Sequence, residues 1–152
     1  MNGFGYPHYA NIIYPFPLNK PFVPHDYNPV GQYKRSFEIP LDWKKKEVFI
    51  HFGAVKSAFY LWVNGEKVGY SQGSKLPSEF NISKYLKTGI NNVSVEVYQF
   101  TDASYLEGID FWRLAGIERD VFLHARPKFM IQDFFAKSTL DTSYKNGEID
   151  LS

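Results

Sequence analysis

A tight hairpin in the first half of the chain limits, more than any other feature, what this sequence can fold into. The apolar run 58–63 leads directly into Asn64-Gly65, and a second run of strand length follows at 66–70. Asn-Gly readily adopts the positive φ angles of a two-residue turn between antiparallel strands. The sequence therefore predicts an antiparallel hairpin, which further strands must join to build a sheet.

Several other segments have the length and periodicity of strands. Phe and Tyr are abundant, at 14 and 11 copies, and long runs of the helix-forming residues Ala, Leu, Glu and Lys are missing. Residues 83–86 could form one helical turn, and residues 76–80 are expected to be irregular. We therefore predict an all-β fold, a two-sheet sandwich of the jelly-roll kind. The additional strands are expected at 33–39, 47–52, 92–100 and 120–125.

Arg126-Pro127 marks a predicted domain boundary. Residues 1–126 would form the jelly-roll, and residues 127–152 would begin a second domain with strands at 129–140 and 148–151. The sequence stops inside the second of these strands, and a strand cut at its end cannot complete a sheet. We therefore expect the tail to be the opening hairpin of a following domain, and the chain to be a fragment.

The first 32 residues differ from the rest in composition. Six prolines lie in this stretch, together with Tyr, Asn and Gly. Proline lacks the N–H donor that a central strand needs, so we expect extended coil with at most an edge pairing. The aromatic side chains of this arm give it apolar surface with which to lie against the body of the protein.

The segment 102–121 is the candidate functional loop. It places Asp110 among Ile109, Phe111 and Trp112, and a buried carboxylate without a partner costs several kcal/mol. Aromatic rings that stack on a pyranose, beside a carboxylate that accepts from its hydroxyls, suit a sugar. Two interpretations stay open: a ligand site, or an Asp110 that pairs with Arg113 to close a structural loop.

Composition excludes several classes of function. A net charge of +1 and a pI near 7.9 argue against nucleic acid as a partner. The absence of cysteine excludes disulfides, zinc–cysteine clusters and thiol catalysis. No stretch approaches the about 20 apolar residues of a membrane helix, and no signal-peptide pattern is present. We expect a soluble protein and leave the compartment open between bacterial-type cytoplasm and periplasm.

Several unusual blocks, in collinear order from about residue 3 to past residue 134, together resemble the N-terminal sugar-binding domain of β-galactosidases in glycoside hydrolase family 2. The family's first strands would precede Met1, which would leave sheet edge exposed in this chain. The blocks are Asn28-Pro-Val-Gly31, Val55-Lys-Ser-Ala-Phe-Tyr-Leu-Trp-Val-Asn-Gly65, Val68-Gly-Tyr-Ser-Gln72, Ser74-Lys-Leu-Pro-Ser-Glu-Phe80 and the segment 102–121.

The resemblance implies a multidomain enzyme that hydrolyses terminal β-D-galactosides by a retaining mechanism. The jelly-roll would be followed by an immunoglobulin-like domain and a barrel that carries two catalytic glutamates about 5–5.5 Å apart. No catalytic residue is expected in this chain, and Glu79 and Glu107 are assigned to structural loops. The alternatives are a stand-alone carbohydrate-binding module, or the same domain of a β-glucuronidase or β-mannosidase.

The resemblance also implies site residues and cofactors. Asn11 and Ile12 match arm residues that reach the galactose subsite, and Asp110 matches an aspartate that touches the sugar and helps hold sodium. Gln72 and Asp102 match two ligands of a peripheral magnesium. We expect sodium and magnesium in the intact enzyme but neither in the fragment. The implied partners are a galactoside substrate, the remaining domains of the same enzyme and further copies of it in a homo-oligomer, with no nucleic acid and no membrane.

Overall fold

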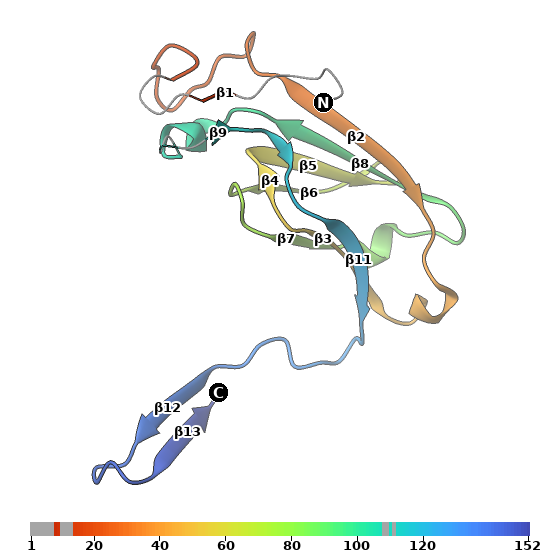
Figure 1. Cartoon of the computed structure of the whole chain (residues 1–152). Helices are drawn as coiled ribbons and strands as arrows, with labels where there is room; N and C mark the ends of the chain where they lie inside the picture. The colour runs from red at the N-terminus through yellow and green to blue at the C-terminus, as the bar shows by residue number, and fades with distance from the viewer. Residues whose placement is uncertain (1–7, 10–13, 108–109, 111) are drawn as a thin grey trace.

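The computed structural model describes residues 8–9, 14–107, 110 and 112–152, and its body is two antiparallel sheets packed face to face (Figure 1). The prediction of an all-β sandwich is confirmed. One sheet has the strand order β2-β8-β5-β6, with bounds Val30–Phe37, Asn91–Tyr98, Ala58–Val63 and Glu66–Gln72. The other has the order β11-β3-β7, with bounds Val121–Arg126, Glu47–Phe52 and Ser78–Asn81.

The core lies between these two sheets and is built by alternation. In β3 every second residue is buried, and Phe52 of this strand meets Phe59 of β5 with ring centroids 4.7 Å apart. Leu61 and Ile82 are fully buried beside them. Full burial of one such side chain stabilises the fold by about 1.5–3 kcal/mol, so this shared layer holds the two sheets together.

The predicted hairpin at 58–70 is confirmed. Asn64 and Gly65 have φ angles of 53° and 87°, and β5 pairs antiparallel with β6 on either side of them. A bulge at Leu61/Trp62 shifts the register within the pair. Both central residues of the turn have positive φ, which is the conformation that Asn-Gly adopts at low cost.

The expectation of irregular structure at 76–80 is wrong, because Ser78–Asn81 forms β7 and pairs with β3. Pro77 lies just before the strand, where its missing N–H breaks no ladder bond. Phe80 packs against the core, and a Cβ added at Gly69 would lie 2.7 Å from its ring. Gly69, on β6 of the other sheet, thus gives Phe80 the space that its ring fills.

Helical structure in the described part of the chain consists of short 3-10 turns. The predicted turn at 83–86 is present as η2 (Ser83–Tyr85), and η1 (Leu41–Trp43) and η3 (Asp102–Tyr105) are further examples. None of the helices among these described residues has the length and apolar composition needed to span a membrane.

The arm lies against the body, as its aromatic content predicts. Phe16 is buried between Phe100 and Tyr105, with ring centroids 5.0 and 5.6 Å away. The Tyr105 hydroxyl donates to the carbonyl of Phe22 over 2.6 Å. The arm also makes the expected edge pairing, because β1 (His8–Tyr9) pairs antiparallel with β9 (Trp112–Arg113).

One side of the sandwich is open between the edge strands β2 and β11. A cleft of about 850 Å³ separates them, and core side chains such as Ile50, Phe52 and Val95 form part of its lining. Val121 and Phe122 of β11 are 39 and 49% exposed. Side chains of the core therefore form part of the wall of this cleft, although Ile50, Phe52 and Val95 are themselves buried.

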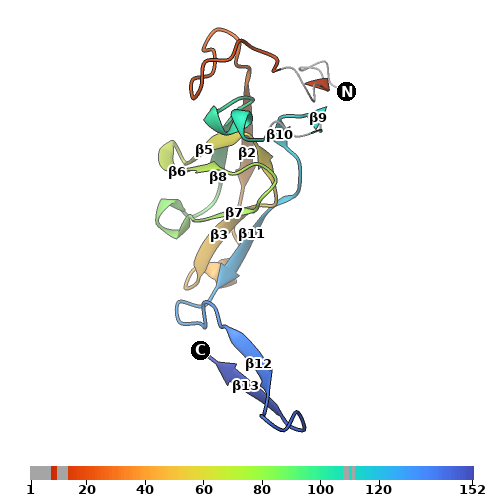
Figure 2. The same cartoon turned by 90° about the vertical axis from the view of Figure 1, so that its left-hand side faces the viewer.

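Beyond Arg126 the chain forms a separate hairpin, β12 (Ala136–Leu140) with β13 (Gly147–Leu151). It projects away from the sandwich in two views at right angles (Figures 1 and 2). The strand predicted for 129–140 is too long, because the observed strand begins at Ala136. Before it, only Phe135 has a facing residue: its backbone exchanges two hydrogen bonds with Ser152. The division into domains at Arg126-Pro127 stays a prediction.

Asn91 should be a stability determinant, because its side chain is fully buried and its hydrogen bonds are satisfied. Its oxygen accepts from Lys87 N and Asn64 Nδ2, and its nitrogen donates to the carbonyls of Lys87 and Gly89. We expect Asn91→Ala to lower the free energy of unfolding by about 3 kcal/mol, measured by urea denaturation. The neighbouring change Asn92→Ala removes one exposed bond from Ser36 and should cost less than about 1 kcal/mol. Equal costs would contradict this role for Asn91.

Candidate functional site

The segment 102–121 is tied to the sandwich at both of its ends. It begins with η3, which Thr101 and Ser104 close as a capping box, and near its end β10 (Gly116–Ile117) pairs with β4 (Val55–Lys56). Gly116 has a φ of 115°, and an added Cβ would lie 2.9 Å from the Tyr33 hydroxyl. Glycine is therefore required where the segment turns back toward the sheet.

The last residue of β6 and the short turn after it contact the same segment at three points. Gln72 donates from its amide nitrogen to Asp102 Oδ1. Ser74 Oγ donates to Glu107 Oε2 over 2.8 Å, and Lys75 Nζ lies 3.2 Å from Glu118 Oε2. These contacts join residues about 30 to 43 positions apart and hold the segment along its length.

The structure brings the arm to the part of the segment that contains Asp110. In the β1–β9 pair, His8 lies opposite Arg113 and Tyr9 opposite Trp112. Asp110 is exposed, and Trp112 is 48% exposed two residues later. An exposed carboxylate close in the chain to an exposed indole is an arrangement that can bind a sugar hydroxyl and stack on a pyranose face.

Two predicted sugar-binding residues, Asn11 and Ile12, lie outside the described residues, as do Ile109 and Phe111. Arg113, the alternative partner of Asp110, is 7% exposed and its guanidinium lies 5.0 Å from the centre of the Tyr14 ring. The arm therefore contacts the segment through a side chain as well as through the β1–β9 ladder. Both interpretations of Asp110 stay open.

The two predicted magnesium ligands, Gln72 and Asp102, are in direct contact. Gln72 Oε1 accepts from the Tyr70 hydroxyl over 2.6 Å, and Asp102 Oδ1 also accepts from the backbone N–H of Ala103. Among the described residues, no group of three or more His, Asp or Glu side chains could hold a metal ion. Magnesium takes six oxygen ligands, so this pair fits it only as part of a larger donor set.

Sequence reasoning missed Lys56, which lies beneath the segment. Its side chain is 9% exposed, and together with Glu107 and Arg113 it lines a cavity of only about 10 Å³. Burial lowers the pKa of Lys56, and the carboxylates of Glu107 and Glu118 act in the opposite direction. The available signal was a lysine inside the otherwise apolar run around Val55 and Ala58.

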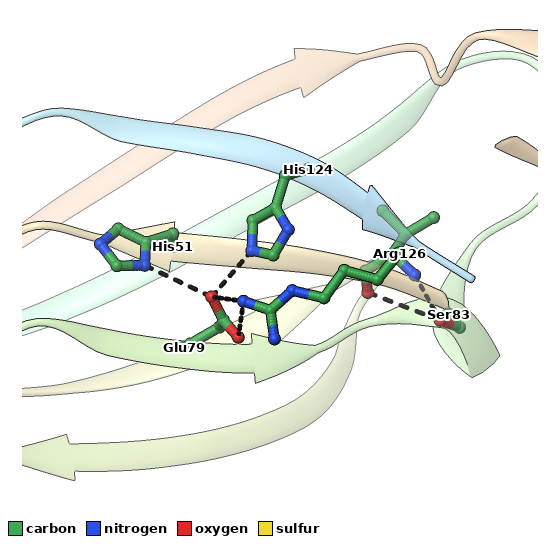
Figure 3. A network of polar contacts seen from close by, with 6 residues as sticks. His51, Glu79, Ser83, His124 and Arg126 are labelled. Atoms are coloured by element: carbon green, nitrogen blue, oxygen red, sulfur yellow. Dashed lines mark hydrogen bonds and ion pairs between the residues drawn. The ribbon is translucent and has the colours of Figure 1, made fainter. Parts of the chain in front are cut away.

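Glu79 belongs to strand β7 and not to a structural loop, which corrects the assignment made from the sequence. Its carboxylate lies on the outer face of the three-stranded sheet, where it binds side chains from the two other strands (Figure 3). His124 Nε2 lies 2.7 Å and His51 Nδ1 3.4 Å from Oε2, and Arg126 lies 3.0 Å from Oε1. This carboxylate is engaged across β3, β7 and β11, which is a structural role.

The chain matches a known protein family over most of its length. The family described as glycosyl hydrolases family 2, sugar binding domain, matches residues 1–127. The chain belongs to this family. The resemblance found in the sequence is thereby confirmed.

Curated relatives in this glycosyl hydrolase family are β-galactosidases. The chain is 49% identical over 156 residues to the enzyme of Priestia megaterium and 44% identical over 154 residues to that of Clostridium acetobutylicum. These matches cover 100 and 99% of the chain but only 15 and 17% of the relatives. The chain therefore spans about one sixth of their length.

Solved structures of β-glucuronidases share the fold of this family 2 domain. An enzyme from an uncultured Clostridium sp. matches with a TM-score of 0.69 and 28% identity over 83% of the chain and 24% of its own. The enzyme of Dictyoglomus thermophilum matches with a TM-score of 0.66 and 26% identity over 84 and 25%. Identity to the β-galactosidases is thus clearly higher than to these β-glucuronidases.

The contacts of Glu79 predict a pH-dependent contribution to stability. Partial burial raises its pKa, but hydrogen bonds from His124 and His51 and the charge of Arg126 outweigh this, so the pKa lies below its ordinary value of 4.5. A carboxyl with a lowered pKa stabilises the fold above the unfolded-state value and loses that contribution as the pH falls through the folded-state value.

We expect Glu79→Gln to lower the free energy of unfolding at pH 7 by about 1 kcal/mol, with the difference from wild type shrinking below about pH 4.5. Urea denaturation at a series of pH values measures this. Glu66→Gln, at an exposed position of the hairpin, is the matched control and should leave stability nearly unchanged. A Glu79→Gln cost that stays constant from pH 7 to pH 3 would contradict the argument.

Proposed function

We propose that this chain is the sugar-binding part of a β-galactosidase that hydrolyses terminal β-D-galactosides by a retaining mechanism, with the catalytic glutamates in a barrel domain outside this chain. The observation that carries the proposal is the β1–β9 pair, because it joins the arm to the segment of Asp110. The identity of 42–49% to curated β-galactosidases supports a galactoside as substrate.

Asn11, Ile12 and Asp110 are the proposed substrate contacts. Asn11 follows Tyr9 by two residues, and Asp110 precedes Trp112 by two. Tyr9 and Trp112 face each other in the antiparallel β1–β9 pair, and one residue of the sequence separates each of Asn11 and Asp110 from this pair. This equal spacing supports a role for Asn11 and Asp110 on one sugar, with the Asn amide and the Asp carboxylate bonding its hydroxyls and Ile12 contributing packing.

Sodium is the proposed cation at Asp110, and magnesium the proposed cation near Gln72 and Asp102. Hard cations take oxygen ligands, and a bound sodium would offer a galactose hydroxyl a coordination site. Asp110 would supply charge and an oxygen ligand on the sugar side of the segment. Gln72 and Asp102 would supply two of the magnesium ligands, and the remaining ligands would come from elsewhere.

The rest of the complete protein enters this proposal in three ways. Residues 127–152 would begin an immunoglobulin-like domain, which would cover the exposed apolar side chains of Phe129 and Ile149. The intact enzyme would be a homo-oligomer. Its further domains would complete the galactoside pocket of which the segment 102–121 forms one wall.

A second candidate is a domain of a β-glucuronidase, which the solved structures with the same fold favour. A stand-alone carbohydrate-binding module is the third. Comparing nitrophenyl β-galactoside with nitrophenyl β-glucuronide as substrates of the complete enzyme separates the first two. Calorimetry of the isolated chain with galactose tests the third. A stand-alone module should bind galactose, whereas a chain that forms only one wall of a pocket should not, because it lacks the convergent polar groups that affinity needs.

The chain alone should not hydrolyse galactosides. A retaining mechanism needs two carboxylates on opposite sides of the glycosidic bond, and Glu79 is engaged by His124, His51 and Arg126. We expect no release of nitrophenol from a nitrophenyl β-galactoside by the purified chain above the rate without protein. Hydrolysis that a point substitution in the chain abolishes would overturn this expectation.

Asp110→Asn in the complete enzyme should weaken both the sodium dependence and catalysis. The substitution keeps the shape of the side chain but removes its charge, and a group in contact with the sugar throughout the reaction contributes to substrate and transition-state binding alike. We expect kcat/KM to fall by about tenfold or more and the sodium concentration for half activation to rise. Asp42→Asn, in an exposed ion pair with Lys46, is the control and should change neither. Unchanged sodium dependence in Asp110→Asn would restore the structural interpretation, in which Asp110 pairs with Arg113.

A further inference from the structure

The side chain of Tyr14 connects the arm with the segment 102–121 on both sides of Asp110. Its hydroxyl donates to the carbonyl of Tyr105 over 2.7 Å, and the centroids of the two rings lie 5.4 Å apart. The guanidinium of Arg113 lies 5.0 Å from the centre of the same Tyr14 ring. Tyr105 precedes Asp110 by five residues, and Arg113 follows it by three. One side chain of the arm thus contacts the chain before and after the candidate sugar-binding carboxylate.

The arm that carries Tyr14 is itself fixed to the body of the protein. Phe16, two residues further along, is 6% exposed and packs edge-on against Phe100, just after β8, with centroids 5.0 Å apart. The side chain of Asn28, at the far end of the arm, exchanges two hydrogen bonds of 2.9 Å with the backbone of Phe100. Tyr14 is therefore held from the sandwich, and not only from the segment that it contacts.

Asp110 lies in a bend, with the short turn η3 before it and the two-residue strand β9 after it. A carboxylate in a bend is positioned by whatever holds the residues on its two sides. The two contacts of Tyr14 differ in chemistry: a hydrogen bond to a backbone carbonyl at Tyr105, and a cation over an aromatic face at Arg113. Tyrosine supplies both, phenylalanine would supply the second alone, and leucine would supply neither.

We propose that Tyr14 is a positioning residue for Asp110: it bridges Tyr105 and Arg113, and so fixes both sides of the stretch that presents this carboxylate to the sugar. Tyr105 is 9% exposed and Arg113 is 7% exposed, so both contacts are shielded from competing water. The role in sugar binding rests on the proposed function, whereas the role in holding the segment does not.

Two substitutions of Tyr14 in the complete enzyme separate its contacts. Tyr14→Leu loses both, so amide hydrogen exchange should accelerate by about tenfold within 105–107 and within 112–114. Tyr14→Phe keeps the ring beside Arg113 and loses only the hydrogen bond, so exchange should rise by about threefold within 105–107 and stay near the wild-type rate within 112–114. Tyr98→Phe is the matched control: it removes a hydroxyl that bonds Glu96 of the same strand and should change neither.

Kinetics of the same variants show whether Tyr14 acts through Asp110. Tyr14→Leu should raise KM for a nitrophenyl β-galactoside about three- to tenfold, with a smaller change in kcat. In the Asp110→Asn background the same substitution should raise KM no further, because a residue that acts through Asp110 then has no carboxylate to position. Tyr98→Phe should leave both constants unchanged.

Three results would contradict these expectations. Exchange at the wild-type rate in Tyr14→Leu would overturn the positioning role of Tyr14. Equal fold-increases in KM with and without Asp110→Asn would also overturn it, since Tyr14 would then act on another part of the site. Faster exchange with KM unchanged in both Tyr14→Leu and Asp110→Asn would instead overturn the proposed contact between this segment and the sugar. Tyr14→Phe keeps the test decisive if Tyr14→Leu does not fold, because it retains the aromatic ring.

Discussion

The crossing from one sheet to the other at residues 53–57 is the constraint on which the rest of the structure depends. This short stretch joins β3 of the three-stranded sheet to β5 of the four-stranded sheet, and its backbone binds the last part of the segment 102–121 and the end of β8. Gly53 N donates to the carbonyl of Asp120, β4 pairs with β10, and Ser57 N donates to the carbonyl of Tyr98. The connection that closes the sandwich is therefore also the base on which the candidate functional segment lies.

Much of the fold follows from local patterns in the sequence, because alternation and turn chemistry act between near neighbours. The Asn64-Gly65 hairpin is the clearest case, since its positive φ angles depend on those two residues themselves. Strand β7 shows the limit of such reasoning. Pro77 and the shortness of the strand argue against it, and only its place beside β3 in the folded sheet explains it. At residues 129–135 the error is the opposite one. The sequence predicts a strand there, but an apolar run forms no strand without a facing partner.

The side-chain clusters could not be predicted, because they depend on which strands become neighbours. His51 and His124 are far apart in the sequence and have no metal-binding spacing, yet the order β11-β3-β7 brings both to Glu79. Lys56 was missed for a similar reason, since the residues that share its small cavity, such as Glu107 and Arg113, lie about 50 to 60 residues further along the chain. The resemblance implied that the arm and Asp110 both reach the sugar, which stays a prediction, and the β1–β9 ladder joins the arm to the segment that contains Asp110.

The two charge clusters of this domain differ in a way that follows from their surroundings. Around Glu79 the charges lie on the outer face of a sheet, with side chains 25 to 33% exposed, where water moderates the benefit of each ion pair. Lys56, by contrast, is 9% exposed and shares a small cavity with Glu107 and Arg113, and its burial lowers its pKa.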